Sequence, residues 1–336
     1  MAKEANKMIV NNIKYTVKNQ PEWFYRSLQK AHTIDKGYVR VLPNVTDETY
    51  IKKLVMDKNT ISQVDTRDCA WTPTKRFTFD GKTIKVKNFK INEEQCLEEL
   101  DSVYSEMIFN SIGATKDQWP AVGEPQNLES ALMFHLQNSL SNDIERLIWG
   151  GAGNEVAGIK NGILDKALAD ESTIKVSNAV TIDSTNVLAE IQRVYDAIPD
   201  AVLNEGEFEP EKAAVQIFVS LDIMRYLKQA LSTTPTSNQV ILPSFTIEGG
   251  VIRYMGVEVA LVGLPKNTMI AASKDNLYFA TDLLSDTTEI RAQMGNDLYD
   301  EAKWYAKGAY RADAGYIFGD ELVVYNSNYL EAIYTK

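Results

Sequence analysis

The residues whose types could carry chemistry begin with a glycine cluster that runs from Gly150 to Gly162. Such a cluster could cradle a phosphate, but a dinucleotide-binding fingerprint follows a strand and opens a helix. This cluster instead follows a predicted helix and lacks the third glycine of that motif. A P-loop needs lysine and serine or threonine after its last glycine, whereas Gly158 precedes Ile159. We therefore interpret the cluster as a loop at a helix end.

Metal chemistry would need a group of carboxylate, thiolate or imidazole ligands. The run from Glu205 to Glu211 offers carboxylates, but it contains Pro210 and lacks EF-hand spacing, which favours a solvated acidic loop. The two cysteines, Cys69 and Cys96, match no zinc motif with the two histidines. We expect buried or half-buried thiols in a reducing compartment, and the pattern leaves a Cys69–Cys96 disulfide open. The sequence predicts no metal and no cofactor.

Catalytic patterns are equally weak. No Gly-x-Ser-x-Gly elbow occurs, and two histidines leave little room for a histidine general base. Carboxylates are abundant, but no spacing marks a pair as catalytic. We predict that the chain is not an enzyme and name no catalytic residue. An α/β enzyme or small-molecule-binding protein with an ordinary pocket remains the alternative from another class.

Length and composition indicate an ordinary globular protein. The chain has 336 residues, of which 44% are hydrophobic and 24% charged. No apolar run reaches the roughly 18 residues that cross a bilayer, and the first residues lack the apolar stretch of a signal peptide. We expect the protein in a cytoplasm, without a membrane partner.

Charge is distributed unevenly along the chain. Residues 1–95 hold 18 Lys and Arg against 11 Asp and Glu, and the remainder holds 17 against 35. A basic segment on an acidic body is typical of a nucleic-acid arm, or of an arm that lies on a neighbouring copy. We favour the second interpretation, because the segment is rich in aromatic and β-branched residues. Specific DNA recognition is the weaker alternative.

The pattern of apolar residues predicts the elements that must position these charges. Helices are expected over 21–32, which includes Trp23 and Phe24, over 93–109, and over 127–149, the clearest of the three. The alternating stretch 77–89 contains Asp80-Gly81, a strong hairpin signal, and places charge along a projecting hairpin through Lys82, Lys85 and Lys87. An α/β pattern begins near residue 183, with helices over 184–198 and 221–231 around a strand at 215–219. Strands are expected from 256 to 325.

In order, these pieces resemble the Hong Kong 97 family of tailed-phage capsid proteins. The resemblance rests on the long helix followed by residues 151–159, and on the segments 277–286 and 303–315 before a last strand. It implies an α+β fold with an N-terminal arm (1–54) and an extended loop (55–92). A peripheral domain with a spine helix (93–182 and 282–318) and an axial α/β domain (183–281 and 319–336) would follow.

The resemblance also implies a function. A major capsid protein self-assembles as hexamers and pentamers into an icosahedral shell, here around double-stranded phage DNA without sequence-specific contact. It would be found in the virion after assembly in the bacterial cytoplasm. Separate scaffolding, portal and decoration proteins are left open as partners, and an encapsulin-like shell around a cargo enzyme is the runner-up. The expected intersubunit contacts are Lys75, Arg76, Lys82, Lys85, Lys87, Trp23 and Phe24.

Covalent cross-linking through a loop lysine and a body asparagine occurs in some members of that family. Lys75, Lys82, Lys85 and Lys87 lie in the corresponding region, but no asparagine can be matched to the pattern. Lysines on a solvated or interfacial face are therefore the favoured interpretation. The extended loop is reached within about sixty residues, which is consistent with a scaffold supplied as a separate protein.

Overall fold

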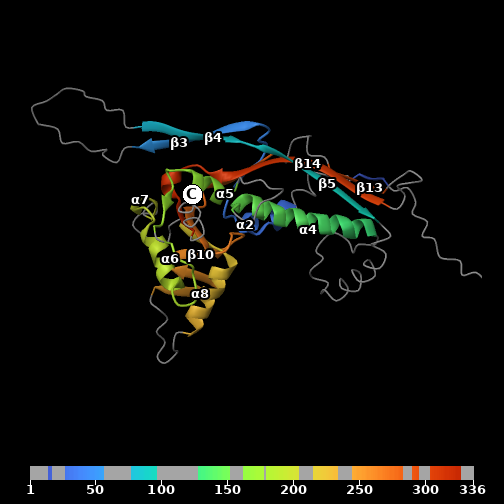
Figure 1. The fold of residues 1–336 in the computed structure, drawn as a ribbon. Coiled ribbons are helices and arrows are strands. Elements are labelled where there is room, and N and C mark those ends of the chain that lie inside the picture. The colour runs from blue at the N-terminus through green and yellow to red at the C-terminus, as the bar shows by residue number, and fades with distance from the viewer. Residues whose placement is uncertain are drawn as a thin grey trace, which may run out of the picture.

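The computed structural model describes residues 14–16, 27–56, 77–96, 128–151, 162–177, 179–203, 215–233, 244–282, 290–294 and 303–326. Within these residues the strands form a six-stranded sheet, a seven-stranded sheet and a two-stranded ribbon. Figure 1 shows the ribbon above one end of the molecule, the long helix beneath the six-stranded sheet, and the seven-stranded sheet with its helices below.

The six-stranded sheet is organised around the long strand β14 (Lys303–Tyr316). Three strands pair with β14 in antiparallel register: β5 (Lys87–Cys96), β12 (Leu277–Thr281) and β13 (Ile290–Met294). β1 (Lys14–Thr16) extends the sheet beyond β13, and β2 (Arg40–Leu42) runs parallel to β12. Alternate residues of β14, from Trp304 to Ala312, are buried, as expected for a strand with one face on a core.

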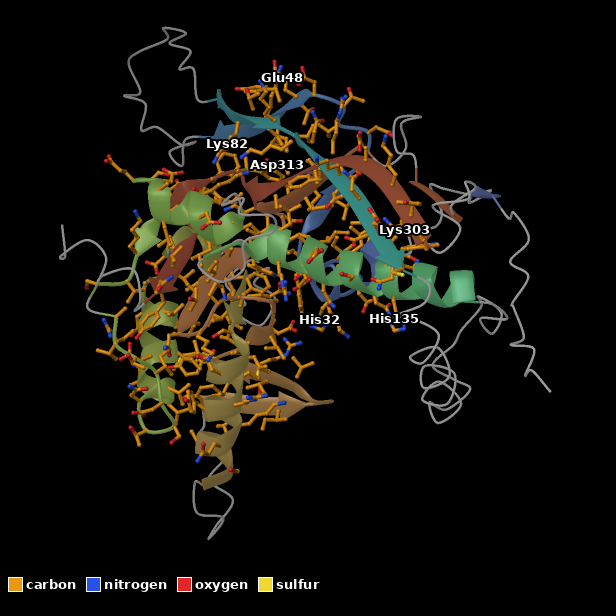
Figure 2. All side chains as sticks on the ribbon, turned by 45° about the vertical axis from the view of Figure 1, so that its right-hand side comes forward. His32, Glu48, Lys82, His135, Lys303 and Asp313 are labelled. Atoms are coloured by element: carbon orange, nitrogen blue, oxygen red, sulfur yellow. The ribbon has the colours of Figure 1, made fainter. Side chains whose placement is uncertain are left out.

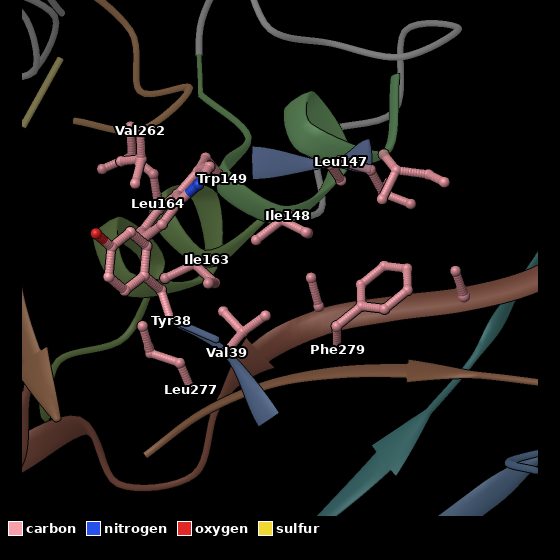
Figure 3. Packing of buried hydrophobic residues seen from close by; sticks show 14 of the residues in the cluster. Tyr38, Val39, Leu147, Ile148, Trp149, Ile163, Leu164, Val262, Leu277 and Phe279 are labelled. Atoms are coloured by element: carbon pink, nitrogen blue, oxygen red, sulfur yellow. The ribbon is translucent and has the colours of Figure 1, made fainter. Parts of the chain in front are cut away.

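The long helix α4 (Leu128–Trp149) confirms the helix predicted over 127–149. Its buried side chains Leu140, Ile144, Leu147 and Ile148 recur at helical spacing and pack in the core with the six-stranded sheet. The helix ends at Gly150, whose φ of 65° is readily adopted by glycine and whose N–H donates to the carbonyl of Arg146. A short helix, α5 (Ile163–Ala169), lies close to this end. Figure 3 shows Trp149, Ile163 and Leu164 in the core that they share with Phe279.

The seven-stranded sheet has the order β6-β15-β11-β7-β10-β9-β8. Its central strand β7 (Val215–Val219) and the helices α6 (Val187–Asp196) and α8 (Leu221–Thr233) confirm the predicted strand and the two predicted helices. α6 and α8 pack against each other, and their apolar faces join the second core. The other strands are β6 (Ile174–Lys175), β8 (Phe245–Glu248), β9 (Val251–Tyr254), β10 (Val257–Leu261), β11 (Thr268–Ser273) and β15 (Val323–Asn326), with two short elements, α7 (Asp200–Leu203) and a 3-10 turn, η3 (Gly319–Glu321).

The two cores meet where the end of α4 touches the seven-stranded sheet. The Trp149 ring lies 4.9 Å, centroid to centroid, from the ring of Phe218 on β7, and Tyr38 packs edge-on against the same phenyl ring at 5.5 Å. Aromatic side chains bury large apolar areas, so this junction ties the two sheets together.

The ribbon differs from the hairpin predicted at Asp80-Gly81. β4 (Phe77–Lys85) runs straight through these residues and pairs along its whole length with β3 (Glu48–Met56), so that Gly81 lies opposite Lys52. The predicted tight turn is therefore wrong. A Cβ on Gly81 would meet the Ile51 carbonyl and would come within 2.8 Å of the Tyr50 ring. The glycine is thus explained by a close approach inside a strand and not by a turn.

The predicted helix over 93–109 is also wrong in its described part. β5 continues to Cys96, which lies opposite Lys303 of β14, so residues 93–96 are a strand. The ladder with β14 supplies backbone hydrogen bonds that override the local helical pattern. Cys96 is half-buried, whereas Cys69 and residues 97–109 lie outside the described residues.

Part of the expected N-terminal arm packs on its own subunit, contrary to the expectation that the arm lies on a neighbour. Residues 27–30 are helical, a second short helix, α2, spans His32–Asp35, and Leu28, Ala31 and Val39 are buried in the core around α4. These side chains are part of the same core as the buried face of α4. The prediction that residues 1–13 and 17–26 contact a neighbour lies outside the described residues.

The expected domain boundaries stay a prediction, and several strands pair across them. β3, for example, lies in the ribbon although residues 1–54 were expected in the arm. β6 lies in the seven-stranded sheet although residues 93–182 were expected in the peripheral domain, and β12 lies in the six-stranded sheet although 183–281 were expected in the axial domain.

In the described part of the chain, no helix combines the length and the apolar character needed to cross a bilayer.

Candidate subunit interface

The two faces of β4 have different chemistry. Lys82, Ile84 and Val86 follow one another on the face that meets the body, and Ile84 and Val86 are buried against Tyr278 and Ala280 of β12. Thr83, Lys85 and Lys87 are exposed on the other side. Successive side chains of a strand point to opposite faces, so the three predicted lysines that the structure describes divide into one that faces its own subunit and two that face outward.

The remaining predicted contacts cannot be placed. Lys75, Arg76, Trp23 and Phe24 lie outside the described residues. Their assignment to an intersubunit contact stays a prediction.

The two outward lysines border a shallow depression of about 520 Å³ at the base of the ribbon. Its lining is mostly polar and carries three cationic side chains and one carboxylate: Thr46, Asp47, Lys85, Val86, Lys87, Asn88 and Arg311. Such a lining can accept a carboxylate or a backbone carbonyl through charge-assisted hydrogen bonds. It offers no nucleophile paired with a base.

Arg311 is the cationic residue of this depression that sequence reasoning missed. Its backbone N–H donates to Asp282 Oδ1 at 2.9 Å, and its guanidinium donates to the carbonyl of Thr46. These contacts fix the arginine beside the ribbon. Arg311 lies opposite Asn88 in the β5–β14 ladder, and no local pattern reveals a register between segments so far apart in sequence.

Beneath the inward face of the ribbon lies a cluster of charged and phenolic groups. The Lys82 ammonium sits 4.2 Å from the centroid of the Tyr316 ring, and the Tyr316 hydroxyl donates to Asp170 Oδ2 at 2.7 Å. Next to them, the Lys166 ammonium donates to both carboxylate oxygens of Asp313 at 2.8 and 2.9 Å. Figure 2 labels Lys82 on the ribbon and Asp313 on the strand below it.

Burial dominates the electrostatics of this cluster. Loss of hydration lowers the pKa of Lys82, although the carboxylates of Asp170 and Asp313 oppose that effect. The pKa of Lys166 is lowered for the same reason, with Asp313 opposing. Burial raises the pKa of the Tyr316 phenol, and its hydrogen bond to Asp170 raises it further.

A second polar cluster joins the N-terminal helices to α4. Glu145 of α4 accepts hydrogen bonds from the Thr33 backbone N–H at 3.0 Å and from the Thr33 hydroxyl at 2.5 Å. Trp149 Nε1 and the backbone N–H of Gly263 donate to the same carboxylate, each at 3.2 Å. These partners of the carboxylate are all groups of the chain itself, which is typical of a structural role.

The described glycines of the cluster act as a helix-end junction, as predicted. Asp165 Oδ2 accepts hydrogen bonds from the backbone N–H groups of Gly151 and Gly162. The carboxylate already occupies the place of an anion, so a phosphate would meet a negative charge there. In the described part of the chain, no group of three or more His, Cys, Asp and Glu could hold a metal ion. The acidic run 205–211 lies outside the described residues.

Comparison with known proteins identifies the fold. One similar structure is the procapsid of satellite phage P4, which includes the size-determination protein. A chain of that procapsid aligns with a TM-score of 0.52 and 9% identity, over 90% of this chain and 98% of that one. A chain from the capsid of an empty GTA particle aligns with a TM-score of 0.51 and 11% identity, over 95% of this chain and 94% of that one. A chain from Gordonia phage Cozz aligns with a TM-score of 0.50 and 11% identity, over 88% of this chain and 86% of that one.

This chain has the Hong Kong 97-type capsid fold. The predicted α+β fold class is therefore confirmed, and α4 corresponds to the predicted spine helix. The ribbon combines β4, which lies within the predicted extended loop, with β3, most of which was expected in the arm. No protein-family model matches the sequence, and no curated protein matches it either. The likeness is one of three-dimensional structure at low identity.

Proposed function

We propose that this chain is a major capsid protein whose copies assemble as hexamers and pentamers into an icosahedral shell. The observation that carries the proposal is the Hong Kong 97-type capsid fold, which extends over nine-tenths or more of the chain in the alignments with the P4 procapsid and the empty GTA capsid. A shell needs large contact areas between subunits. A ribbon that projects from the body supplies such area without enlarging the core.

The shell would enclose the double-stranded DNA genome of a phage without sequence-specific contact. A net charge of −11 supports this role, because an acidic wall does not cling to packaged DNA. On this proposal the protein is structural and not catalytic, is found in the virion, and assembles in the bacterial cytoplasm. Scaffolding, portal and decoration proteins would be its partners besides further copies of itself.

The contact with a neighbouring copy would use the outward face of the ribbon. Lys85 and Lys87 are exposed and border the depression that also contains Arg311. The rest of the chain carries a large excess of Asp and Glu, so opposite charges would register adjacent subunits. Lys75, Arg76, Trp23 and Phe24 remain proposed contacts of the same interface. Lys82 faces its own body, which favours an intrachain role.

Size-exclusion chromatography and negative-stain microscopy of the purified protein test the proposal. Shells or capsomers are the expected result, and a stable monomer or dimer under all conditions would contradict it. Nuclease-protected DNA inside particles would support the phage role. Particles that contain a co-purifying enzyme and no nucleic acid would instead support an encapsulin-like shell.

A further inference from the structure

Among the described residues, the base of the ribbon packs on its own subunit through a small apolar cluster that includes Ile84 of β4, Val86 just after it and Ile51 of β3. Ile84 and Val86 are buried against the six-stranded sheet, and Lys82 continues the same face one step further out. Beyond Lys82 the ribbon extends by the pairs from Gly81–Lys52 to Phe77–Met56. At about 3.3 Å per residue these add roughly 15 Å, so a small rotation at Lys82 is magnified along the ribbon.

The site under Lys82 both attracts and disfavours a cation. The face of the Tyr316 ring attracts an ammonium group, and the carboxylates of Asp170 and Asp313 add attraction. The Lys166 ammonium opposes it, and burial removes water from the amine, so that the pKa of Lys82 is lowered overall. The titratable groups that face this site come from α5 and the residue after it, from β12 and from β14: Lys166, Asp170, Tyr278, Asp313 and Tyr316.

Because the pKa of Lys82 is lowered, burial of the charged amine outweighs the attraction of the two carboxylates, although the amine still lies over the Tyr316 ring. A charge that loses hydration without a dedicated ion-pair partner is held weakly, unlike Lys166 in its bidentate pair with Asp313. The contact can therefore open at small cost.

We propose that Lys82 is a positioning residue that holds the ribbon against its own body in a weak, releasable contact and so sets the direction in which the ribbon leaves the subunit. One consequence of this contact rests on the proposed function: the direction of the ribbon would present Lys85 and Lys87 to a neighbouring subunit. The contact itself is a property of one subunit.

Pulsed electron-paramagnetic-resonance distances test the contact directly. Spin labels are placed on the outer part of the ribbon, beyond Lys82, through Thr78→Cys and on the exposed surface of α8 through Lys228→Cys, with Cys69 and Cys96 replaced by serine. Labelled subunits are diluted into unlabelled protein, so that each distance belongs to one copy. Shell formation is scored separately, and its failure would contradict the proposed function without changing these distances.

Three variants distinguish the effect of the Lys82 charge from the effect of its aliphatic side chain. Lys82→Glu places a carboxylate beside Asp170 and Asp313 and should increase the population with a displaced ribbon about tenfold, which corresponds to about 1.4 kcal/mol. Lys82→Met keeps the stem and removes the desolvated charge, so its distance distribution should be at least as narrow as that of the wild type. Lys52→Glu makes the same charge change on a ribbon lysine whose ammonium lies 5.9 Å from the ring of Tyr50 on the same strand, and should leave the distances unchanged.

The outcomes that overturn the proposal are equally definite. An unchanged distribution in Lys82→Glu, or an equal displacement in Lys52→Glu, would show that Lys82 does not position the ribbon. A Lys82→Met ribbon as mobile as that of Lys82→Glu would show that the cation is strongly attracted, and so would exclude a weak, releasable contact.

Discussion

Glu145 Oε1 accepts a hydrogen bond from the backbone N–H of Gly263 at 3.2 Å, although the two residues belong to different parts of the fold. Glu145 lies in the spine helix, and Gly263 lies between β10 and β11 of the seven-stranded sheet. The same carboxylate binds Thr33 near α2. One side chain thus fastens three segments that are distant in sequence.

Replacing this carboxylate should destabilise the whole subunit. Glu145→Ala leaves the backbone N–H groups of Thr33 and Gly263 without this acceptor, and each uncompensated buried donor costs about 1–3 kcal/mol. Trp149 Nε1 keeps its hydrogen bond to the Thr33 hydroxyl oxygen. We expect a loss of roughly 2–4 kcal/mol in the free energy of unfolding, measured by urea denaturation. Arg146→Ala, at the adjacent and largely exposed position, should change it by less than about 0.5 kcal/mol. Equal effects at both positions would contradict the role of Glu145.

The glycine inside the ribbon should be needed for strand pairing. Gly81→Ala pushes a methyl group against the Ile51 carbonyl and the Tyr50 ring, and overpacking of this kind costs about 1–3 kcal/mol. We expect hydrogen exchange of the ribbon amides to accelerate about tenfold or more while the core amides are unaffected. Thr83→Ala, an exposed site on the same strand, is the control. Unaltered ribbon exchange in Gly81→Ala would show that the strands pair more loosely at this point.

Charge on the outward face should control assembly. The double variant Lys85→Glu with Lys87→Glu reverses two cations of the depression and should raise the protein concentration needed for shell formation at least about tenfold. Light scattering during assembly measures this, and added salt should weaken wild-type assembly because exposed charges are screened beyond about 8 Å at physiological ionic strength. Lys90→Glu, also exposed but outside the depression, provides the matched control. If it inhibits assembly as strongly, overall charge and not this site is responsible.

Alkaline pH should destabilise the fold through its buried phenols. Burial and the neighbouring carboxylate of Asp313 raise the pKa of Tyr278 above its usual value of about 10. Between that value and the higher folded-state pKa the unfolded chain loses a proton that the folded chain keeps, so stability is complete below about pH 10 and falls as the pH rises further.

Tyr278→Phe isolates this contribution. The variant should lose about 1 kcal/mol at pH 7, because the hydrogen bond from Tyr278 to Asp313 Oδ2 disappears. Above pH 10 it should lose stability less steeply than the wild type, as measured by urea denaturation between pH 8 and 11. A variant whose curve runs parallel to that of the wild type would show that Tyr278 titrates normally.

Sequence periodicity predicted the elements whose stability is local. The spine helix and the pair α6 and α8 show apolar residues at helical spacing, and β7 is a short apolar run bounded by polar residues. The fold class followed from the order of such pieces. Each of these patterns lies within one continuous segment of the sequence.

The errors have one physical source, which is pairing between distant segments. Asp80-Gly81 carries a strong turn signal, yet β4 finds a nine-residue partner in β3 and stays extended. Residues 93–96 are drawn into a strand by β14, more than two hundred residues away. For the same reason Arg311, Glu145 and the Tyr316 ring beneath Lys82 could not be assigned to their sites, because no local pattern encodes register.

The central position of β14 has a consequence for the order of folding during synthesis. Of the described strands in its sheet, β14 is made last, although β5, β12 and β13 all pair with it. The ribosome must therefore deliver residues 303–312 before β5 can pair with β14, and residue 316 before the Tyr316 ring comes to lie beneath Lys82. Contacts of such large sequence separation form slowly. If the ribbon binds a neighbouring copy as proposed, an unfinished polypeptide would lack the contacts that orient it, and association would follow the translation of β14.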